Sequence, residues 1–494
     1  MSYNYTLIGL FCLIFTQIVG QNEEDALRYS NTDIQGTARY AGMGGAFGAL
    51  GADITVLSTN PAGMGRYKNN VLTGTINVED ATTLSTLNGA DNTSNFSKNV
   101  LNNLGIIGVS KTSVSNPSPW RKVQFGFAYN RLAEFNDTYT VKGENNASYS
   151  YVLADRGYGR TPDGLVNYDG HYSSLAYESF LIDYVNDSNQ HYYTTQMYSY
   201  NGEGILTEHS VSSKGRVGES AFSLSGNYAD KVYLGATIGV DKIIFDRTKT
   251  HYESANSDSL AIDNFTFTEN LSTRGNGVNL KLGIIVLPEP WLRLGLALHT
   301  STNYYYMRDT WNSELRTSFK DGDRFGIESL SSSYVYKMKT PGKAIGSVAF
   351  IAKKYGVVSL DVEYVNYGNA LLKNHQNSGD SYDFNFENTT SDLLYQPALN
   401  IRAGVEYKIT NQFMARVGYG LNGQPFKKEY REEATPRSKY SLGLGFRSDQ
   451  FFIDLAVIHN QQKENYYLYD SQLISNSVQT KQWTNGLLTI GLKI

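Results

Sequence analysis

Apolar and polar residues alternate at every second position in many short stretches of this chain. The stretch at the carboxyl end is the clearest, because Leu488, Ile490, Leu492 and Ile494 are separated by threonine, glycine and lysine. Side chains on a β-strand point to opposite faces with a period of two, so this stretch predicts a strand with one apolar and one polar face. A strand that faces lipid on one side and a polar lumen on the other needs this pattern, which indicates a transmembrane β-barrel.

About fourteen stretches share this alternation, an even number as expected of a single-chain bacterial barrel. We expect strands near residues 70–79, 103–111, 122–132, 218–228, 232–245, 276–287, 291–300, 342–353, 357–367, 397–408, 412–420, 438–447, 451–460 and 486–494. Short turns and long polar segments alternate between them, which is the usual asymmetry between periplasmic turns and extracellular loops. We expect the long loops at residues 80–102, 133–217, 246–275, 301–341, 368–396, 421–437 and 461–485.

The polar sides of the predicted strands carry charged residues. A charge on the lipid face costs roughly 2–4 kcal/mol for Arg or Lys at the bilayer midplane, so these side chains must face the lumen. In a restricted space we expect them to pair into an ordered network. The candidate lumen charges are Asp361, Glu363, Arg402, Glu406, Arg416, Arg447 and Asp454. A soluble sandwich of two sheets would show similar alternation, but it would have to bury these charges or turn its polar faces outward.

The amino-terminal segment has the features of a secretory signal peptide. An apolar core at residues 7–19, too short to span a bilayer, is followed by Gly20 and the polar run Gln21–Asp25. We therefore expect residues 1–20 to be a signal peptide that is removed after Gly20. The only cysteine, Cys12, lies in this segment, so the mature chain is expected to hold no disulfide and no thiolate metal site.

The composition is that of a β-rich protein without a nucleic-acid partner. The chain has 494 residues, with 46 glycines, 38 tyrosines and 22 phenylalanines against 10 prolines. Aromatic residues favour strands, and glycine serves turns and bulges. The net charge is −4 with both signs dispersed, which argues against binding to phosphate backbones. A mean hydropathy of −0.38 is compatible with a barrel, because only every second residue of a strand touches lipid.

A glycine-rich segment precedes the first predicted strand, and the triplet Asn60-Pro61-Ala62 follows it. Glycine has no Cβ and admits positive φ, so such a segment can pack closely inside a barrel. Pro61 biases Asn60 away from helix and fixes a turn before the chain enters the wall. The glycine spacing does not fit a dinucleotide-binding loop, because Phe47 stands where a glycine is required and no strand precedes it.

These residues resemble the amino-terminal hatch of the FadL/TodX family of outer-membrane transporters of hydrophobic compounds, in the form common in Bacteroidetes-type bacteria. The triplet at residues 60–62 matches the NPA signature of that family. The resemblance implies that residues 21–68 form a hatch, or plug, on the periplasmic side of the lumen, and that residues 69–494 form the barrel. The hatch and gate residues are then Asn60, Pro61, Ala62, Gly63, Gly42, Gly44, Gly45 and Gly48. A barrel of this size has a lumen wide enough to need such a plug.

The function that the resemblance implies is passive uptake of hydrophobic small molecules, such as long-chain fatty acids or aromatic hydrocarbons. Capture at the loops would be followed by movement of the hatch and lateral exit through the wall. The expected location is the bacterial outer membrane, and the expected partners are the ligand, the lipids of that membrane and the barrel-assembly machinery. Two other functions stay open, namely a shuttle or docking barrel similar to the PorV subunit of type IX secretion, and a haemin receptor.

No catalytic residue, cofactor or metal site is expected. The seven histidines are scattered, at positions 171, 191, 209, 251, 299, 375 and 459, and form no i,i+4 pair. Haem or zinc would need two or more that converge, so we interpret them as solvated loop histidines. There is no G-x-S-x-G motif, and no Ser-His-carboxylate set can be assigned, which disfavours an enzyme.

Overall fold

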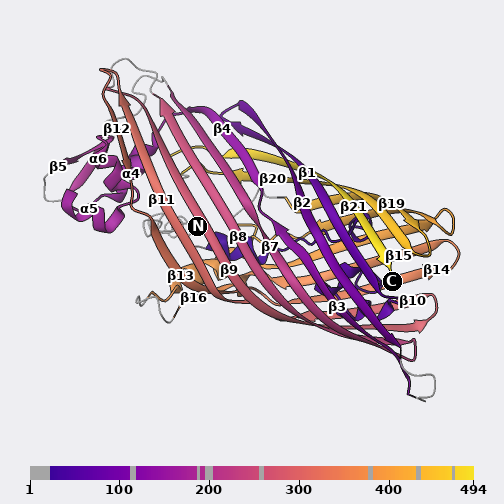
Figure 1. Cartoon of the computed structure of the whole chain (residues 1–494). Coiled ribbons are helices and arrows are strands. Elements are labelled where there is room, and N and C mark those ends of the chain that lie inside the picture. Colours follow the sequence, from indigo (N-terminus) through magenta and orange to yellow (C-terminus); the bar gives the residue numbers. More distant parts are fainter. Residues whose placement is uncertain are drawn as a thin grey trace, which may run out of the picture.

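The computed structural model is a closed antiparallel β-barrel with a short segment of chain folded inside it (Figure 1). It describes residues 23–111, 118–185, 190–194, 204–254, 261–375, 382–429, 435–469 and 473–494. The predicted signal peptide, residues 1–20, lies outside the described residues.

Fourteen strands form the wall, and some of them consist of two labelled parts. In chain order they are β1 (Val71–Leu87), β2 (Ala90–Lys111), β3 (Trp120–Glu134) with β4 (Asp137–Asn145), β7 (Ile205–Tyr228), β8 (Val232–Ser254), β9 (Ile262–Glu289), β10 (Leu292–His299) with β11 (Asn303–Phe319), β13 (Ser332–Lys339) with β14 (Lys343–Ala352), β15 (Gly356–Asn366) with β16 (Leu371–Asn374), β17 (Pro397–Lys408), β18 (Phe413–Asn422), β19 (Arg437–Arg447), β20 (Phe451–Tyr466) and β21 (Ser477–Lys493). β1 pairs with both β2 and β21, which closes the barrel. The predicted fold class, an all-β antiparallel barrel of 14 strands, is confirmed.

Short helices lie inside the barrel and beside its rim. Those inside are α2 (Glu23–Ser30), α3 (Ala38–Gly42), η2 (Ile54–Ser58) and η3 (Pro61–Arg66). A lobe beside β11 and β12 (Arg324–Glu328) contains α4 (Tyr149–Arg156), α5 (Pro162–Asp169), α6 (Ser173–Glu178), β5 (Ile182–Val185) and β6 (His191–Thr194) (Figure 1). The remaining elements are η4 (Tyr367–Asn369) and α7 (Asn385–Leu394). None of the described helices is both long and apolar enough to cross a membrane.

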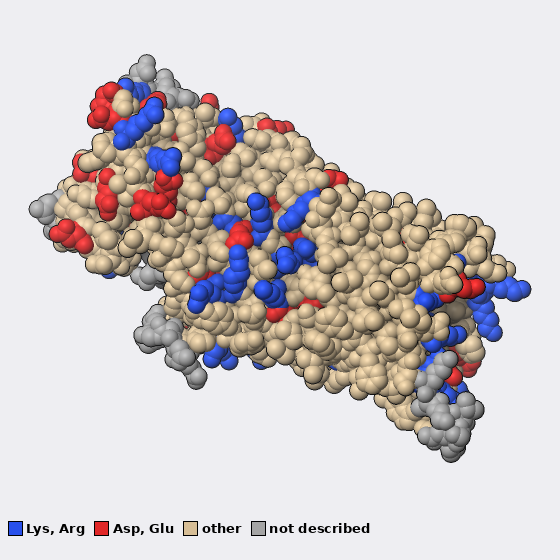
Figure 2. All heavy atoms as spheres, viewed as in Figure 1, with Lys and Arg blue, Asp and Glu red and all other residues tan. Residues whose placement is uncertain are grey.

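The outer face of the wall carries an apolar band next to the short turns. Exposed apolar side chains in this band include Leu224 on β7, Leu234 and Val240 on β8, and Leu282 on β9. Beyond Val240 the next exposed position of β8 is Lys242. Figure 2 shows one part of the barrel surface almost without charged side chains, bounded by lysines, arginines and acidic residues. Such a band is the surface that a membrane barrel presents to lipid.

Several strands extend far beyond this band. β7, β8 and β9 contain 24, 23 and 28 residues, whereas about 9–11 residues suffice to cross a bilayer. Much of the chain that was expected as loop, at residues 80–102, 246–275 and 301–341, is therefore strand, and the predicted loop boundaries are wrong. The physical reason is that both faces of a strand can be polar outside lipid, as where Thr82 bonds to Asn95 at 3.0 Å across β1 and β2. Alternation then gives no signal.

Candidate functional site

Residues 23–67 fold inside the barrel, and we name them the inner segment (Figure 1). They cover most of the predicted hatch, residues 21–68. Apolar side chains of the inner segment form one buried cluster with the wall, in which Phe47, Leu57 and Met64 are fully buried. The lumen is therefore filled by packed side chains at this level.

Asn60 ties two turns of the inner segment together. Its side-chain amide donates to the Gly48 carbonyl oxygen at 2.6 Å, and its Oδ1 accepts from the Ala62 N–H at 3.2 Å. It is the N-cap of η3, and Pro61 occupies the first turn, where a missing N–H breaks no helical hydrogen bond. Because Asn60 and Ala62 are 1% and 0% exposed, both contacts are shielded from water.

Glycines let the inner segment approach the wall closely. Gly44 has a φ of +62°, and a Cβ there would lie 2.7 Å from the Tyr419 carbonyl oxygen on β18. A Cβ on Gly48 would lie 1.9 Å from Ser347 Oγ on β14. Larger residues at these two positions would push the segment away from the wall. A Cβ on Gly42, Gly45 or Gly63 would also meet a neighbour at 3.2 Å or less.

A row of buried ion pairs links the inner segment to one side of the wall, and we name it the ionic row. Arg39 of α3 binds Glu406 on β17 at 3.0 Å, and Glu406 binds Arg416 on β18 at 2.7 Å. Asp454 on β20 binds Arg416 at 2.7 Å and Arg447 on β19 at 2.8 Å. Removing one partner of a buried pair costs about 3–5 kcal/mol, because the other charge stays buried. The ionic row therefore anchors the inner segment strongly.

The other three predicted lumen charges lie close by. Arg402 binds Glu363 at 3.0 Å, and Asp361 Oδ2 accepts a hydrogen bond from the Gly48 N–H at 2.8 Å. The structure thus places all seven candidate lumen charges on the inner face of β15 and β17–β20, where they contact each other or the inner segment.

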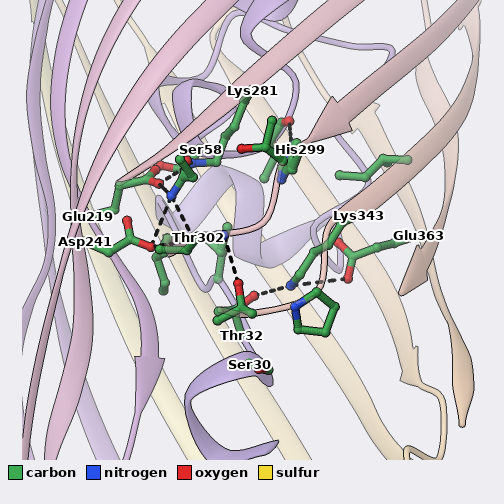
Figure 3. Close-up of a pocket in the computed structure, with 18 of the residues that line it drawn as sticks. Ser30, Thr32, Ser58, Glu219, Asp241, Lys281, His299, Thr302, Lys343 and Glu363 are labelled. Atoms are coloured by element: carbon green, nitrogen blue, oxygen red, sulfur yellow. Dashed lines mark hydrogen bonds and ion pairs between the residues drawn. The ribbon is translucent and has the colours of Figure 1, made fainter. Parts of the chain in front are cut away.

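A small polar cavity of about 50 Å³ lies between the inner segment and the wall (Figure 3). Lys281 on β9 donates to Glu219 on β7, with Asp241 of β8 beside them. The ring of His299 bonds through Nε2 to the Thr59 carbonyl oxygen at 2.5 Å. Figure 3 shows two polar groups of side chains at this cavity, one around Glu219, Asp241 and Lys281 and one around Lys343 and Glu363. A cavity of about 50 Å³ with such a lining is large enough for water but not for a long apolar ligand.

A larger cavity of about 460 Å³ lies between α2 and the inner face of several strands, among them β8 and β20, and we name it the vestibule. Its aromatic lining consists of Phe135, Tyr139, Phe245, Tyr395, Phe426, Tyr466 and Trp483. Five cations also line it, of which Arg28, Arg437 and Lys481 each have a carboxylate partner. Arg247 and Lys249 on β8 have no carboxylate within 4.0 Å among the residues that the structure describes. Six carboxylates line it as well, those of Glu24, Asp33, Glu79, Glu134, Asp137 and Glu464. The vestibule therefore combines aromatic rings with charges of both signs, among which Arg247 and Lys249 have no described carboxylate in ion-pair contact.

The wall has a seam between β2 and the next strand. The ladder between β2 and β3 stops at the pair Asn103–Asn130. Residues 90–102 of β2 pair with β1 alone, and β4 pairs with β7 alone. We name this stretch, from residue 90 to 102 on one side and 131 to 145 on the other, the seam.

The seam arises because the strand formed by β3 and β4 bends at Phe135 and Asn136. Gly215 of β7 holds the bend, since its carbonyl oxygen accepts from the Phe135 N–H at 3.0 Å and its N–H donates to Asn136 Oδ1 at 3.2 Å. A Cβ on Gly215 would lie 2.2 Å from the Ile244 carbonyl oxygen. The close approach of β8 therefore requires glycine at this bend.

Side chains cross the seam where the ladder is missing. Lys98 Nζ donates to Asn136 Oδ1 at 2.9 Å, and the Thr140 N–H donates to Ser94 Oγ at 3.0 Å. Asn136 also lines the vestibule, so the vestibule reaches the inner side of the seam. Side-chain contacts therefore separate the vestibule from the outside of the barrel here.

The inner segment lies against the lower end of the seam. The Asp33 N–H donates to the Leu132 carbonyl oxygen at 2.7 Å, and Asn102 Nδ2 donates to the Gly36 carbonyl oxygen at 2.5 Å. The seam was not predicted, although the doublet Asn102-Asn103 was a usable signal. Two adjacent polar residues interrupt the alternation of β2, and the register shifts opposite them.

The prediction of solvated loop histidines is wrong for His299, which lies on β10 and bonds to Thr59, and for one pair of histidines. His209 and His251 are each 4% exposed, and their Nδ1 atoms lie 3.2 Å apart. Each sits on the inner face of a strand extension that we had expected to be a solvated loop. Within the described part of the chain, no group of three or more His, Cys, Asp and Glu residues is arranged to hold a metal ion.

No family model and no curated protein sequence matches the chain. Solved structures match its fold. A FadL homologue from Pseudomonas aeruginosa is 13% identical with a TM-score of 0.55, over 94% of this chain and 98% of that one. A deltaS2 mutant of the TodX monoaromatic hydrocarbon channel is 12% identical with a TM-score of 0.54, over 93% and 98%. The CymD monoaromatic hydrocarbon channel is 10% identical with a TM-score of 0.51, over 94% and 99%.

At these identities the similarity establishes the fold, which is the one that the hatch motif had indicated. The Bacteroidetes-type form of the family stays a prediction. By its fold, the chain belongs with the FadL and TodX outer-membrane barrels.

Proposed function

We propose that the protein is an outer-membrane channel, not an enzyme, for passive uptake of hydrophobic small molecules, and that the inner segment is its hatch. The related barrels TodX and CymD are described as hydrocarbon channels, which supports this class of function. The observation that carries the proposal is the vestibule, because it lies over the packed inner segment and reaches the seam. A ligand in the vestibule meets a filled lumen below it and a weakly closed wall beside it.

The hatch blocks the direct route through the barrel. Its buried apolar cluster leaves no path for ions at the level of Phe47 and Met64, and the ionic row holds it to the wall. The turn at Asn60-Pro61-Ala62 lies within this packed region, so a change in that turn would move the hatch as a unit.

Lateral exit through the seam is the path of lowest free-energy cost. Opening the wall elsewhere would break a row of backbone hydrogen bonds, each worth about 0.5–1.5 kcal/mol net. At the seam, contacts such as that of Lys98 with Asn136 have to separate instead. Displacement of residues 34–36 of the hatch, where the Gly36 carbonyl oxygen accepts from Asn102, would free the seam at its lower end.

The vestibule favours an amphiphilic ligand with an acidic head, such as a long-chain fatty acid, over an uncharged hydrocarbon. Aromatic rings such as Phe135 and Phe245 offer apolar surface to a tail. Arg247 and Lys249 offer two positive charges that make no ion-pair contact with a described carboxylate, so a carboxylate head can pair with them directly.

A cross-link across the seam tests the proposal. Ser94→Cys with Thr140→Cys places two thiols across the seam, where Ser94 Oγ lies 3.0 Å from the Thr140 nitrogen. With the disulfide formed, we expect cells to take up labelled long-chain fatty acid no faster than cells without the protein. Reductant should restore uptake.

The matched control is Thr82→Cys with Asn95→Cys, which joins β1 to β2 at a position where the two strands are already paired. Its disulfide should leave uptake unchanged. Uptake that continues through the cross-linked seam would refute lateral exit, whereas no uptake by the parent protein would refute the proposed ligand class.

A further inference from the structure

The buried histidine pair lies in the part of the wall that extends beyond the apolar band. His209 and His251 are direct partners in the ladder between β7 and β8. Exposed apolar side chains on β8 end at Val240, and Lys242 follows. His251 is nine residues beyond Lys242, which corresponds to roughly 30 Å at about 3.3 Å per residue. The pair is therefore outside the membrane-spanning part of the barrel.

The two rings are the centre of a buried hydrogen-bonded chain of four side chains. Their Nδ1 atoms lie 3.2 Å apart. His209 Nε2 lies 3.0 Å from the hydroxyl of Tyr466, and His251 Nε2 lies 2.8 Å from Glu253 Oε1. Tyr466 lines the vestibule, so the chain connects Glu253 with the site of the proposed ligand.

The carboxylate of Glu253 is surrounded by hydrogen-bond donors. Its side chain is 0% exposed and accepts from the Tyr149 N–H at 2.8 Å and from the Ser148 hydroxyl, in addition to the contact with His251. Ser148 is also the N-cap of α4. Three donors are directed at this one carboxylate, which therefore accepts in all three contacts. His251 Nε2 therefore carries a proton and donates it to Glu253.

With both rings neutral, the direction of every hydrogen bond is fixed. His251 Nδ1 must accept, so His209 Nδ1 carries a proton and donates to it. His209 Nε2 then accepts from the Tyr466 hydroxyl. In this state the hydroxyl proton of Tyr466 points into the protein, away from the vestibule.

A single added proton reverses this direction without breaking a contact. A protonated His251 donates through both nitrogens, to Glu253 and to His209. His209 Nδ1 then accepts, and its Nε2–H donates to the Tyr466 oxygen. The hydroxyl proton of Tyr466 is thereby released from His209 and can be donated to a group in the vestibule.

The charged groups that face the two rings differ. Burial, followed by the charges of His251, Lys249 and Arg247, lowers the pKa of His209 well below its usual value. His251 instead faces the carboxylate of Glu253 at 2.8 Å. Titratable and aromatic side chains surround the pair. β8 contributes Lys249, Arg247 and Glu253, and β9 contributes Glu269, Phe265 and Phe267. The others are Tyr139 of β4, Tyr149 and Tyr172 of the lobe, and Tyr466 and Tyr469 at and after the end of β20.

We propose that ligand binding in the vestibule is linked to uptake of one proton at His251, through reversal of the hydrogen bonds from His251 to His209 to Tyr466. The ligand is one with an anionic head, as the proposed function requires, and Tyr466 is the residue that presents the extra hydrogen bond. Binding of the head favours protonation of His251, and by linkage protonation of His251 favours binding to the same degree.

Binding of a long-chain alkyl sulfonate to the protein in lipid nanodiscs tests the linkage, because a sulfonate head stays anionic across the pH range used. Titration calorimetry compares binding at pH 7.5 and at pH 5.5, an interval in which histidine side chains as a class change charge. We expect about tenfold tighter binding at pH 5.5, the effect of one hydrogen bond to a charged group. Near pH 6.5, paired measurements in buffers of different ionisation enthalpy should show proton uptake on binding.

His251→Gln keeps a donor and an acceptor but does not titrate, so its affinity should be equal at both pH values and proton uptake should vanish. Tyr466→Phe should also bind no more tightly at pH 5.5 than at pH 7.5, because it lacks the hydroxyl that donates to the ligand head. His459→Gln is the matched control, because His459 contacts Thr484 on β21 and lies outside the chain of four, and it should behave as the parent.

If the parent binds the sulfonate equally tightly at both pH values, the linkage is wrong. It is also wrong if the pH dependence of the affinity survives in both His251→Gln and Tyr466→Phe. No binding by the parent at either pH would refute the vestibule as the ligand site, and with it the proposed function. The two failures are therefore distinct.

Discussion

Replacing Asn60 with alanine should loosen the hatch while leaving the wall intact. The substitution removes the donor to the Gly48 carbonyl oxygen and the cap on the Ala62 N–H. Loss of an asparagine N-cap costs about 0.5–2 kcal/mol, and a buried carbonyl left without its donor costs about 1–3 kcal/mol. A combined loss of about 2–3 kcal/mol would raise the population of displaced hatch at least roughly 30-fold.

Planar-bilayer recordings measure that population directly, since each displacement of the hatch opens a path for ions. We expect brief openings to be far more frequent in Asn60→Ala than in the parent. Uptake of labelled long-chain fatty acid at matched surface levels should fall, because the displaced hatch no longer forms the ordered floor of the vestibule. Ala62→Leu, which adds volume at a fully buried position, should act in the same direction.

Asn95→Ala is the matched control for Asn60→Ala. Asn95 Oδ1 accepts from the exposed Thr82 hydroxyl at 3.0 Å, so the same substitution removes an asparagine hydrogen bond on β2, away from the hatch. If Asn60→Ala conducts and transports like Asn95→Ala, then Asn60 does not anchor the hatch and the reasoning fails.

Two further predictions concern the wall. Glu406→Gln removes the carboxylate shared by Arg39 and Arg416. Breaking a buried pair costs about 3–5 kcal/mol, so the folded band in semi-native electrophoresis should disappear at a lower temperature than in the parent. An unchanged temperature would show that the ionic row does not stabilise the protein. Deleting Leu492–Ile494 removes the end of β21 that pairs with β1 and β20, so folded, heat-modifiable protein should be absent from the outer membrane, and normal assembly of the truncated chain would contradict a role for this strand in closure.

The wall near the short turns could be predicted because lipid imposes a strict rule on each strand separately. Leu280 and Leu282 must face outward and Lys281 inward whatever their neighbours do, so a local pattern of period two is enough. The same rule identifies the lumen charges, since Arg416 has no tolerable position on a lipid face.

The vestibule, the seam and the histidine pair depend on which strands meet, and local patterns do not determine that. Lys98 and Asn136 lie on consecutive strands of the wall and contact each other because Gly215, on a third strand, allows the bend. His209 and His251 lie in two segments that both appeared as polar loops, although His251 and Glu253, two residues apart on one face of a strand, were a partial signal.

The contacts of the inner segment differ in strength from one side of the barrel to the other. Toward β17–β20 it is held by ions, with Arg39 bound to Glu406 at 3.0 Å and Asp33 bound to Arg437 at 2.6 Å. Toward the seam its described contacts are neutral hydrogen bonds, such as those of Gly36 with Asn102 and of Asp33 N–H with Leu132.

A neutral hydrogen bond contributes about 0.5–1.5 kcal/mol, whereas breaking a buried ion pair costs about 3–5 kcal/mol. Displacement of the hatch is therefore expected to begin at residues 34–36, beside the seam, while Arg39 with the ionic row and Asp33 with Arg437 act as the pivot. The weakest contacts of the hatch and the weakest contacts of the wall lie at the same place, the seam. The wall is therefore expected to open and the hatch to move in a single event. Glu406→Gln should weaken the pivot and Asn102→Ala the seam side, so hydrogen exchange at residues 34–36 should accelerate more in the second variant. The opposite order would refute a pivot at the ionic row.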